Sequence, residues 1–327
     1  MSFLVSEVHI DQALSDFAVA YGQDLSQVGI AEKIAPPLIV PKLSDYYWVG
    51  GKESFNIPDV KRAPNAVFPR INLTISKNRF SCDGYGVEVP VAREEVANAD
   101  AAIQPEQMGV QLAVDTLRLN YERRVAALIQ DTSTFTNTSA LTGGNMWDTG
   151  TSNPVYDIQL AKDTIFGLVG RKPNLLILGR TVFSALRQHP DIIERVKYVQ
   201  LGTMRNITEQ MLAQVFDIDE LVVPWALYNT AAEYYDPTTG KPTTTLSDVW
   251  GKVAIIAYVD PAGGSLQAKR VTPARTFVWG GSPAGGRFSV STYYEPQRNA
   301  NIIQCIDYTA EASIDINTLY QYTTVVS

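Results

Sequence analysis

The stretch YYWVGGKESFNIPDVKRAPNAVFPRINLTISKN, from Tyr46 to Asn78, decides the fold of this chain. Apolar residues alternate with polar ones in two runs of it, which is the period of a β-strand. The alternating apolar residues are Phe55, Ile57, Ile71, Leu73 and Ile75. Prolines and other turn-forming residues lie between the two runs. The pattern predicts a long β-hairpin with one apolar face, and an isolated ribbon of this kind needs a surface to lie on.

The segment before the hairpin, residues 1–45, is predicted to be an arm. Helix-like sequence over 5–19 gives way to IAPPLIVPK, where Pro36, Pro37 and Pro41 exclude a continuous helix or a central strand. Such an arm has little to pack against in its own chain. We expect it to be disordered or to be held by a neighbouring subunit.

The strongest helical pattern begins near Pro105 and continues to residue 130. Its apolar residues fall at steps of three or four and form one stripe along a helix. They are Val110, Val114, Leu117, Tyr121, Val125 and Leu128. Proline is tolerated in a first turn, and Glu106 suits the positive end of the helix dipole. A helix of about 36 Å is long for a globular protein of this size.

Helices and strands alternate from residue 153 to residue 280, which predicts a compact α/β unit. Asn153 is a candidate N-cap with Pro154 at the first helical position, and Thr208 is a second candidate cap. LLIL is predicted to be a short buried strand, and the apolar runs ELVVPW and KVAIIAYV have the length of strands that are buried on both faces. The C-terminal part of the chain returns to strand patterns.

Composition limits the class of protein. The chain has 327 residues, a net charge of −7 and two cysteines. No stretch approaches the roughly 20 apolar residues of a membrane helix, and the N-terminus lacks a secretory signal pattern. A protein that grips DNA specifically more often carries a basic face, whereas an acidic chain is compatible with merely enclosing nucleic acid. Cys82 and Cys305 are too few for a disulfide framework, so we expect packed thiols in a protein made in a reducing cytosol.

The sequence contains no recognisable constellation for chemistry. The glycine-rich segment 280–288 lacks the lysine of a phosphate-binding loop, and no nucleophile elbow or zinc-binding helix motif is present. The carboxylates from Asp217 to Glu220 lack the spacing of a calcium loop, which favours a solvated turn. His9 and His189 have no partner at metal-ligand spacing. We therefore expect no catalytic, cofactor-binding or metal site, although paired carboxylates come together only in a fold.

Arg123 and Arg124, on the long helix, are candidates to contact a partner or nucleic acid. A solvated helix face with local ion pairs is the alternative. Trp225, Trp250 and Trp279 are expected to be core residues or anchors of a subunit contact. Together with the five apolar hairpin residues, we take Arg123, Arg124 and Trp225 as candidate subunit contacts.

The order of these parts resembles that of the major capsid proteins of tailed bacteriophages, which have the Hong Kong 97-type fold. The resemblance covers nearly the whole chain as an order of elements. It rests on the hairpin, the long helix, DELVVPWALYNT (219–230), VWGKVAIIAYV (249–259) and YYEPQRNANIIQCIDY (293–308). It implies an α+β fold in four parts. These are an N-terminal arm (1–45), an extended hairpin loop (46–84), a peripheral domain (85–152 and 281–327) with the spine helix (105–130), and an α/β axial domain (153–280).

The resemblance implies a structural protein with no enzymatic activity and no cofactor. In the family the extended loop lies across the neighbouring subunit, so its apolar face is buried in trans. The implied assembly consists of hexamers and pentamers in an icosahedral shell, the capsid of a virion assembled in the bacterial cytoplasm. The shell would enclose double-stranded DNA without sequence-specific binding. The expected partners are a portal protein at one vertex, a separate scaffolding protein (the arm begins almost at once) and, as a further candidate, a decoration protein. No membrane partner is expected.

Two other functions stay open. Bacterial encapsulin compartments resemble phage capsids but enclose enzymes, so shell size and contents would distinguish them. An enzyme built on the 153–280 unit would be a monomer or dimer with a cleft and a nucleophile or metal constellation.

Overall fold

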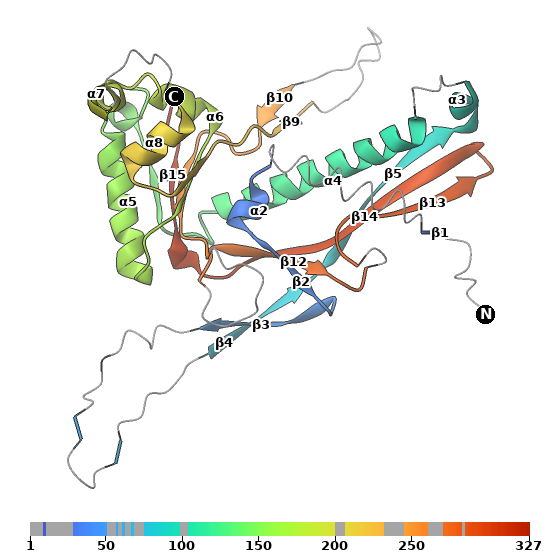
Figure 1. Ribbon diagram of the computed structural model, residues 1–327, viewed down its shortest axis with the longest axis horizontal. Helices are drawn as coiled ribbons and strands as arrows, with labels where there is room; N and C mark the ends of the chain where they lie inside the picture. Colours follow the sequence, from blue (N-terminus) through green and yellow to red (C-terminus); the bar gives the residue numbers. More distant parts are fainter. Residues whose placement is uncertain are drawn as a thin grey trace.

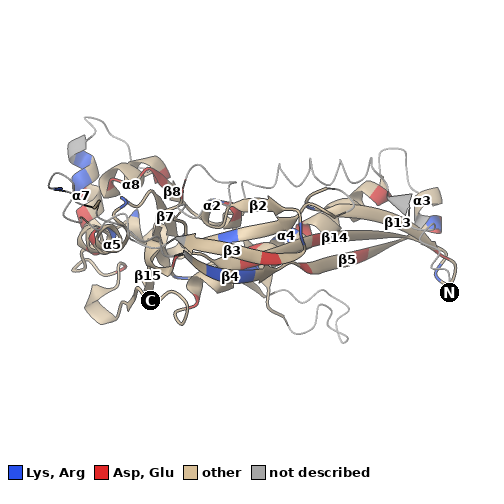
Figure 2. Cartoon of the chain, turned by 90° about the horizontal axis from the view of Figure 1, so that it is seen from below, with Lys and Arg blue, Asp and Glu red and all other residues tan. Residues whose placement is uncertain are grey.

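The computed structural model describes residues 9–10, 29–50, 57, 61–62, 67–68, 75–98, 104–199, 207–231, 245–260, 271–282 and 285–327. These residues form a six-stranded sheet, a five-stranded sheet and two sheets of two strands each. The molecule is elongated (Figure 1), with the five-stranded sheet and most helices at one end. Figure 2 shows the six-stranded sheet and the pair β3–β4 running along its length.

The six-stranded sheet has the order β1-β13-β14-β12-β2, and β5 pairs along the other edge of β14. Its strands are β1 (His9–Ile10), β2 (Pro37–Val40), β5 (Asp83–Ala92), β12 (Ala274–Trp279), β13 (Ser289–Glu295) and β14 (Ala300–Ser313). β5 and β14 are antiparallel over ten residue pairs, and β14 also pairs with β12 and β13, so it is the central strand.

The long helix α4 (Pro105–Gln130) lies along one face of this sheet and has the bounds that the apolar stripe predicts. Its buried residues Val110 and Val114 pack against β5 and β14, whose inward side chains include Val91 and Ile303. The predicted end of the stripe is wrong by one residue. Ile129 is fully buried, whereas Leu128 is only partly buried.

The five-stranded sheet has the order β6-β15-β11-β7-β8. Its strands are β6 (Thr138–Ala140), β7 (Leu175–Leu178), β8 (Glu220–Val222), β11 (Ala254–Ala257) and β15 (Leu319–Thr323). Its neighbouring helices are α5 (Pro154–Val169), α6 (Arg180–Leu186), α7 (Pro190–Val199) and α8 (Glu209–Phe216). β7, from LLIL, and β11, from KVAIIAYV, are buried at every position, as predicted. The expectation is wrong for ELVVPW, because its strand β8 lies at the edge of the sheet, where Glu220 is exposed and Val222 is only partly buried.

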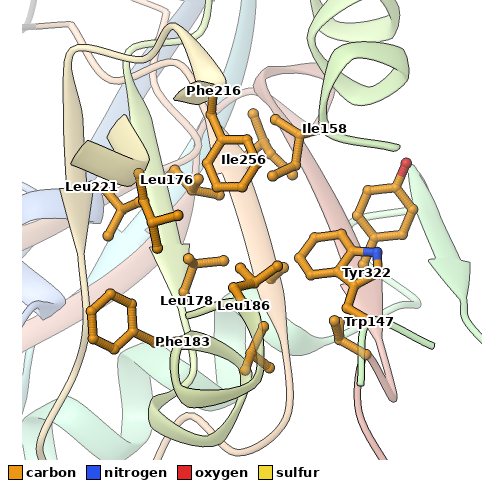
Figure 3. Packing of buried hydrophobic residues seen from close by; sticks show 14 of the residues in the cluster. Trp147, Ile158, Leu176, Leu178, Phe183, Leu186, Phe216, Leu221, Ile256 and Tyr322 are labelled. Atoms are coloured by element: carbon orange, nitrogen blue, oxygen red, sulfur yellow. The ribbon is translucent and has the colours of Figure 1, made fainter. Parts of the chain in front are cut away.

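Alternating residues of β7 explain why both faces of this sheet are buried. Leu176 and Leu178 point into a core with α5, α6 and α8 (Figure 3). Leu175 and Ile177 belong to a second core. The C-terminal half of α4 contributes Val125 and Ile129 to this core. The spine helix therefore packs against both large sheets and joins them.

The sheets divide the chain differently from the domain boundaries in the sequence analysis. β6 and β15, placed there in the peripheral part, hydrogen-bond into the sheet of the 153–280 unit. β12, placed there in the axial part, pairs with β14 in the other sheet. The reason is that strands pair with their neighbours in space, which can be distant in sequence. Boundaries placed at single positions in the sequence cannot reproduce such pairing.

The helix caps agree with the sequence analysis. Asn153 Oδ1 accepts a hydrogen bond from the Tyr156 N–H at 3.1 Å, and Thr208 Oγ1 accepts one from the Met211 N–H at 3.4 Å. Each satisfies a backbone donor that a first helical turn leaves free. Gly170 ends α5 in the left-handed conformation at φ 69°.

The remaining described elements connect these layers. They are α2 (Ala31–Ile34), α3 (Arg93–Asn98), the 3₁₀ turns η4 (Gly143–Asn145) and η5 (Ile316–Thr318), and the pairs β3 (Ser44–Gly50) with β4 (Ile75–Ser81) and β9 (Leu227–Asn229) with β10 (Leu246–Asp248). Within the described ranges no helix is both long enough and apolar enough to cross a membrane.

Candidate subunit interface

The predicted hairpin begins as the β3–β4 ribbon. Seven residue pairs join the strands, from Ser44 with Ser81 to Gly50 with Ile75. Of the five apolar residues predicted to face a partner, Ile57 is described and 95% exposed. Ile75 opens β4, whereas Phe55, Ile71 and Leu73 lie outside the described residues.

Large apolar side chains of the ribbon segment are in contact with water. Val67 is 82% exposed and Phe68 is 69% exposed, close to the value for Ile57. The Arg62 guanidinium lies 4.2 Å from the centre of the Phe68 ring, but it leaves most of the ring open. Exposed apolar groups gathered in one segment mark a contact surface for another molecule.

One face of the base of the ribbon is covered by its own chain, which the sequence analysis did not predict. Phe80 stacks on Phe277 of β12 with ring centres 4.3 Å apart. The Tyr47 hydroxyl donates a hydrogen bond to the Ser313 carbonyl at 3.0 Å. Beyond this base Ile57 and Phe68 are exposed, and on the other face of the base Tyr46 and Trp48 are about half exposed.

The two candidate arginines of the spine contact their own chain. Arg124 forms a largely buried ion pair with Glu311 at 2.7 Å, and its guanidinium lies 3.5 Å from the ring centre of Tyr85. Arg123 is exposed and lies 5.1 Å from the ring centre of Tyr228. The expected solvated face with local ion pairs is therefore wrong for Arg124, because its ionic partner comes from β14, far along the chain.

Trp225 is an exposed aromatic residue beside a groove. It is 55% exposed, and with Arg180, Phe183 and Arg187 it lines a groove of about 780 Å³. The other two tryptophans expected to be core residues or contact anchors differ: Trp250 is buried, and Trp279 is partly buried against the cluster around Phe277. Trp225 thus keeps the exposure that a subunit contact requires.

Glu122 is a buried residue that sequence reasoning missed. Its Oε1 accepts hydrogen bonds from the Ile30 N–H at 3.0 Å and the Trp250 indole N–H at 2.7 Å. Its Oε2 accepts one from the Ala31 N–H at 3.0 Å. Burial raises the pKa of this carboxyl, and the nearby charge of Glu32 adds to the shift. The sequence carries no signal for this role, because Glu122 stands in a charged run typical of a solvated helix face.

The polar groups considered as candidates for chemistry contact other residues of their own chain. Among them, no group of three or more His, Cys, Asp and Glu side chains is placed to bind a metal ion. His189 is buried, with Nε2 3.2 Å from both the Ser152 hydroxyl and the Thr149 carbonyl. Asp217 pairs with Lys172 at 2.8 Å and Lys162 at 3.3 Å, and the hydrogen bond from Lys172 lowers its pKa. Both side chains thus have polar partners within their own chain.

Comparisons with known proteins point to one class. Residues 132–270 match the family model "Phage major capsid protein E". The major capsid protein of Burkholderia phage BcepMu is 27% identical over 274 residues, which is 81% of this chain and 81% of that protein. A solved phage-related protein of Bordetella bronchiseptica RB50 is 25% identical, with a TM-score of 0.74 over 98% of both chains.

More distant structures share the fold alone. The capsid of cyanophage P-SCSP1u has a TM-score of 0.60 at 11% identity, over 90% of this chain and 88% of that one. The SrpI encapsulin of Synechococcus elongatus PCC 7942 has a TM-score of 0.51 at 12% identity, over 90% and 86%. The predicted α+β capsid fold is confirmed, and it occurs in both phage shells and encapsulins.

Proposed function

We propose that this chain, a phage major capsid protein of the Hong Kong 97-type fold, assembles into hexamers and pentamers of an icosahedral shell around double-stranded DNA. The protein is a component of the virion capsid, and in this proposal the shell forms in the cytoplasm of the host bacterium. The proposal includes a portal protein at one vertex, a separate scaffolding protein and a decoration protein as further partners.

The exposed apolar residues of the ribbon segment carry this proposal. Ile57, Val67 and Phe68 have the highest exposure among the large apolar side chains of the described residues. Burying one such side chain stabilises by about 1.5–3 kcal/mol, so three of them in one contact can drive association. In this proposal the ribbon of one copy contacts a different surface of the next copy, and such head-to-tail contacts close into rings when the rotation between copies allows it.

The spine helix α4 connects the two large sheets of the subunit, which supports the proposed assembly role. α4 packs on both large sheets, so a force on one sheet reaches the other through a rigid helix. We propose the axial role for the five-stranded sheet and its helices, and the peripheral role for the six-stranded sheet. A subunit built this way holds several interfaces in fixed relative positions, which a closed shell requires.

The test is assembly of the purified full chain, alone and co-expressed with the product of a neighbouring scaffold gene. Negative-stain electron microscopy and light scattering should show shells, tubes or rings. The double variant Ile57→Asp/Phe68→Asp should keep the melting temperature of the wild-type subunit and lose assembly. The control is Gln159→Glu, which also introduces a negative charge but places it on the exposed face of α5. This variant should assemble. A chain that stays a monomer or dimer at high concentration in both settings would refute the proposal.

An encapsulin-like compartment is the second candidate, because the SrpI encapsulin shares the fold. The two differ in cargo. Particles isolated from the natural host should contain double-stranded DNA if the chain builds a phage head. A single enclosed enzyme, identified by mass spectrometry of nuclease-treated particles, would favour the compartment.

A further inference from the structure

We propose that residues 11–28 of the N-terminal arm pack as a helix along the outward face of the spine helix α4 of their own chain. The segment lies outside the described residues, but described residues fix both of its ends. The inference goes beyond the proposed function and does not depend on it, because it concerns the single subunit.

The outward face of α4 carries a stripe of residues that is covered at one end only. Met108, Leu112, Asp115, Leu119 and Glu122 recur at steps of four, three, four and three, so they share one face of the helix. Met108 and Leu112 are each 59% exposed, whereas Glu122 is buried against the backbone at the start of α2. The arm thus covers the C-terminal end of this stripe, and the N-terminal end has large apolar side chains in water.

A hollow of about 440 Å³ continues the stripe at its covered end. Its lining includes Asp115, Arg118 and Leu119 of α4. It also includes Gly29, the first described residue after the segment. The residues that precede Gly29 in the sequence therefore start from the wall of this hollow.

The other end of the segment is held near the N-terminal half of the same helix. β1 pairs with Ser291 and Thr292 of β13, and Thr292 pairs with Ile303 of β14. Ile303 contacts the spine at Gly109, where an added Cβ atom would lie 2.9 Å from Ile303 Cδ1. The segment therefore begins at the level of Gly109 and ends at the level of Glu122.

Both ends of the segment are on the same side of the spine. β1 pairs with β13, and β2, which follows α2, pairs with β12. β12 and β13 lie one after the other along the edge of β14 that is opposite β5. A chain that joins β1 to α2 by a short path therefore runs along this side of α4.

The length of the segment fits a helix on this path. From Gly109 to Glu122 the spine rises by about 20 Å, at 1.5 Å per residue. Residues 11–28 span about 27 Å as a helix and about 60 Å as an extended strand. A helix covers the distance and leaves a few residues for turns at its ends, whereas an extended chain is much too long.

The sequence of the segment has the apolar pattern of such a helix. Leu14, Phe17, Tyr21, Leu25 and Val28 recur at steps of three, four, four and three, which places them on one helical face. A short amphipathic helix is stable in water only when another surface covers its apolar face. The exposed stripe of α4 offers such a surface next to the chain that leads into it.

Charge complements this apolar contact. The segment contains three aspartates and no lysine, arginine or histidine. Arg118, in the lining of the hollow, belongs to no ion pair among the described residues, and its buried Nε has no hydrogen-bond partner there. In a helix that runs antiparallel to α4 from Gly29, Asp24 reaches the level of Arg118. The pairing gives this half-buried cation a carboxylate.

Hydrogen exchange of the full-length subunit, at a concentration below that at which particles form, tests the docking. Amides within 11–28 should exchange about tenfold or more slowly relative to an unstructured peptide. Met108→Asp/Leu112→Asp puts two charges on the exposed stripe and should abolish this protection. Tyr156→Asp/Leu160→Asp puts the same charges at the same spacing on the exposed face of α5, so it is the matched control and should keep the protection.

A disulfide test identifies the chain that supplies the arm. Phe17→Cys or Tyr21→Cys, combined with Leu112→Cys, should form a cross-link within one chain of the dilute subunit. The same arm variants combined with Leu160→Cys on α5 should form none. The two native cysteines are buried and do not compete. A cross-link between two chains would show that a second copy supplies the arm, and would overturn the docking within one chain.

Two further results would overturn the inference. One is exchange of residues 11–28 at the rate of an unstructured peptide in the wild type. The other is unchanged protection in the Met108→Asp/Leu112→Asp variant. Because all of these measurements use the unassembled subunit, none of their outcomes bears on whether the chain builds a shell.

Discussion

The Trp250 indole donates a hydrogen bond to Glu122 Oε1 at 2.7 Å, which ties the segment before β11 to the C-terminal half of the spine helix. The same carboxylate accepts from the backbone of Ile30 and Ala31, at the start of α2. One buried side chain thereby holds three separate parts of the chain together. The arrangement places a negative charge in an apolar cluster, where donors from the surrounding chain partly offset the loss of water.

The charge of Glu122 should make stability depend on pH. Burial raises its pKa in the folded chain above the value of about 4.3 for an unfolded one. Ionisation of Glu122 therefore lowers the free energy of unfolding near neutral pH. This loss of stability disappears as the pH falls through the pKa of the folded state and the carboxyl becomes protonated. Relative to Glu122→Gln, which cannot titrate, the wild type should gain melting temperature as pH falls from 7 towards about 4.5.

The control for this experiment is Glu194→Gln on the exposed face of α7. This variant removes one carboxyl from the surface and separates a general effect of net charge on melting temperature from the effect of the buried carboxyl. A flat or inverted difference between wild type and Glu122→Gln would contradict the buried state of the carboxyl.

Gly179 should tolerate no side chain. A Cβ atom there would lie 2.0 Å from the Gly251 carbonyl oxygen, and the obstacle is backbone. We expect Gly179→Ala to destabilise the subunit by about 3 kcal/mol or more, or to prevent folding. Gly167 is the matched control. It lies in α5 with open space around its Cβ position, so Gly167→Ala should stabilise by about 0.5–1 kcal/mol. Urea unfolding of both variants measures the contrast, and equal effects would contradict the packing.

Arg287 and Asp307 should be strongly coupled. The guanidinium contacts Asp307 Oδ2 at 2.7 and 3.1 Å, and the carboxylate is almost fully buried. Arg287→Met leaves an unpaired buried charge and should cost about 3–5 kcal/mol. Adding Asp307→Asn should recover part of this loss, and a double-mutant cycle gives the coupling.

A surface pair provides the comparison. Lys42 and Asp45 are 3.1 Å apart and both well exposed, so Lys42→Met should change stability by less than about 1 kcal/mol. Additive effects of Arg287→Met and Asp307→Asn would show that the buried pair is not an interacting unit.

The two thiols should be unreactive in the folded protein. Burial raises the pKa of Cys82 to about 11 and that of Cys305 to about 12. At pH 8 only about one Cys82 thiol in a thousand is then a thiolate, the reactive form. A thiol reagent such as DTNB should modify neither residue in native subunits and both in guanidinium chloride. Rapid modification of the native protein would show that at least one thiol is accessible to solvent and would contradict the prediction.

Much of the secondary structure follows from local pattern. The stripe from Val110 to Val125 predicts α4 because an apolar face at helical spacing has to be buried. The caps at Asn153 and Thr208 follow from the same local chemistry. The candidate interface is less predictable: exposure of Ile57 agrees with the apolar pattern, but the cis burial of Tyr47 and Phe80 depends on where β12 and β14 pass.

The burial and pairing of charged residues could not be predicted from the local sequence pattern. Glu122, Arg123 and Arg124 are neighbours in sequence, yet the first is buried, the second exposed and the third paired with a distant strand. Helical geometry points consecutive residues in different directions, so each meets a different part of the chain. The sequence by itself determined the elements, their order and the apolar faces that need cover, because these depend on short-range periodicity. Only the tertiary structure decided which sheet each strand joins and which charges are buried, because those depend on contacts between residues far apart in the chain.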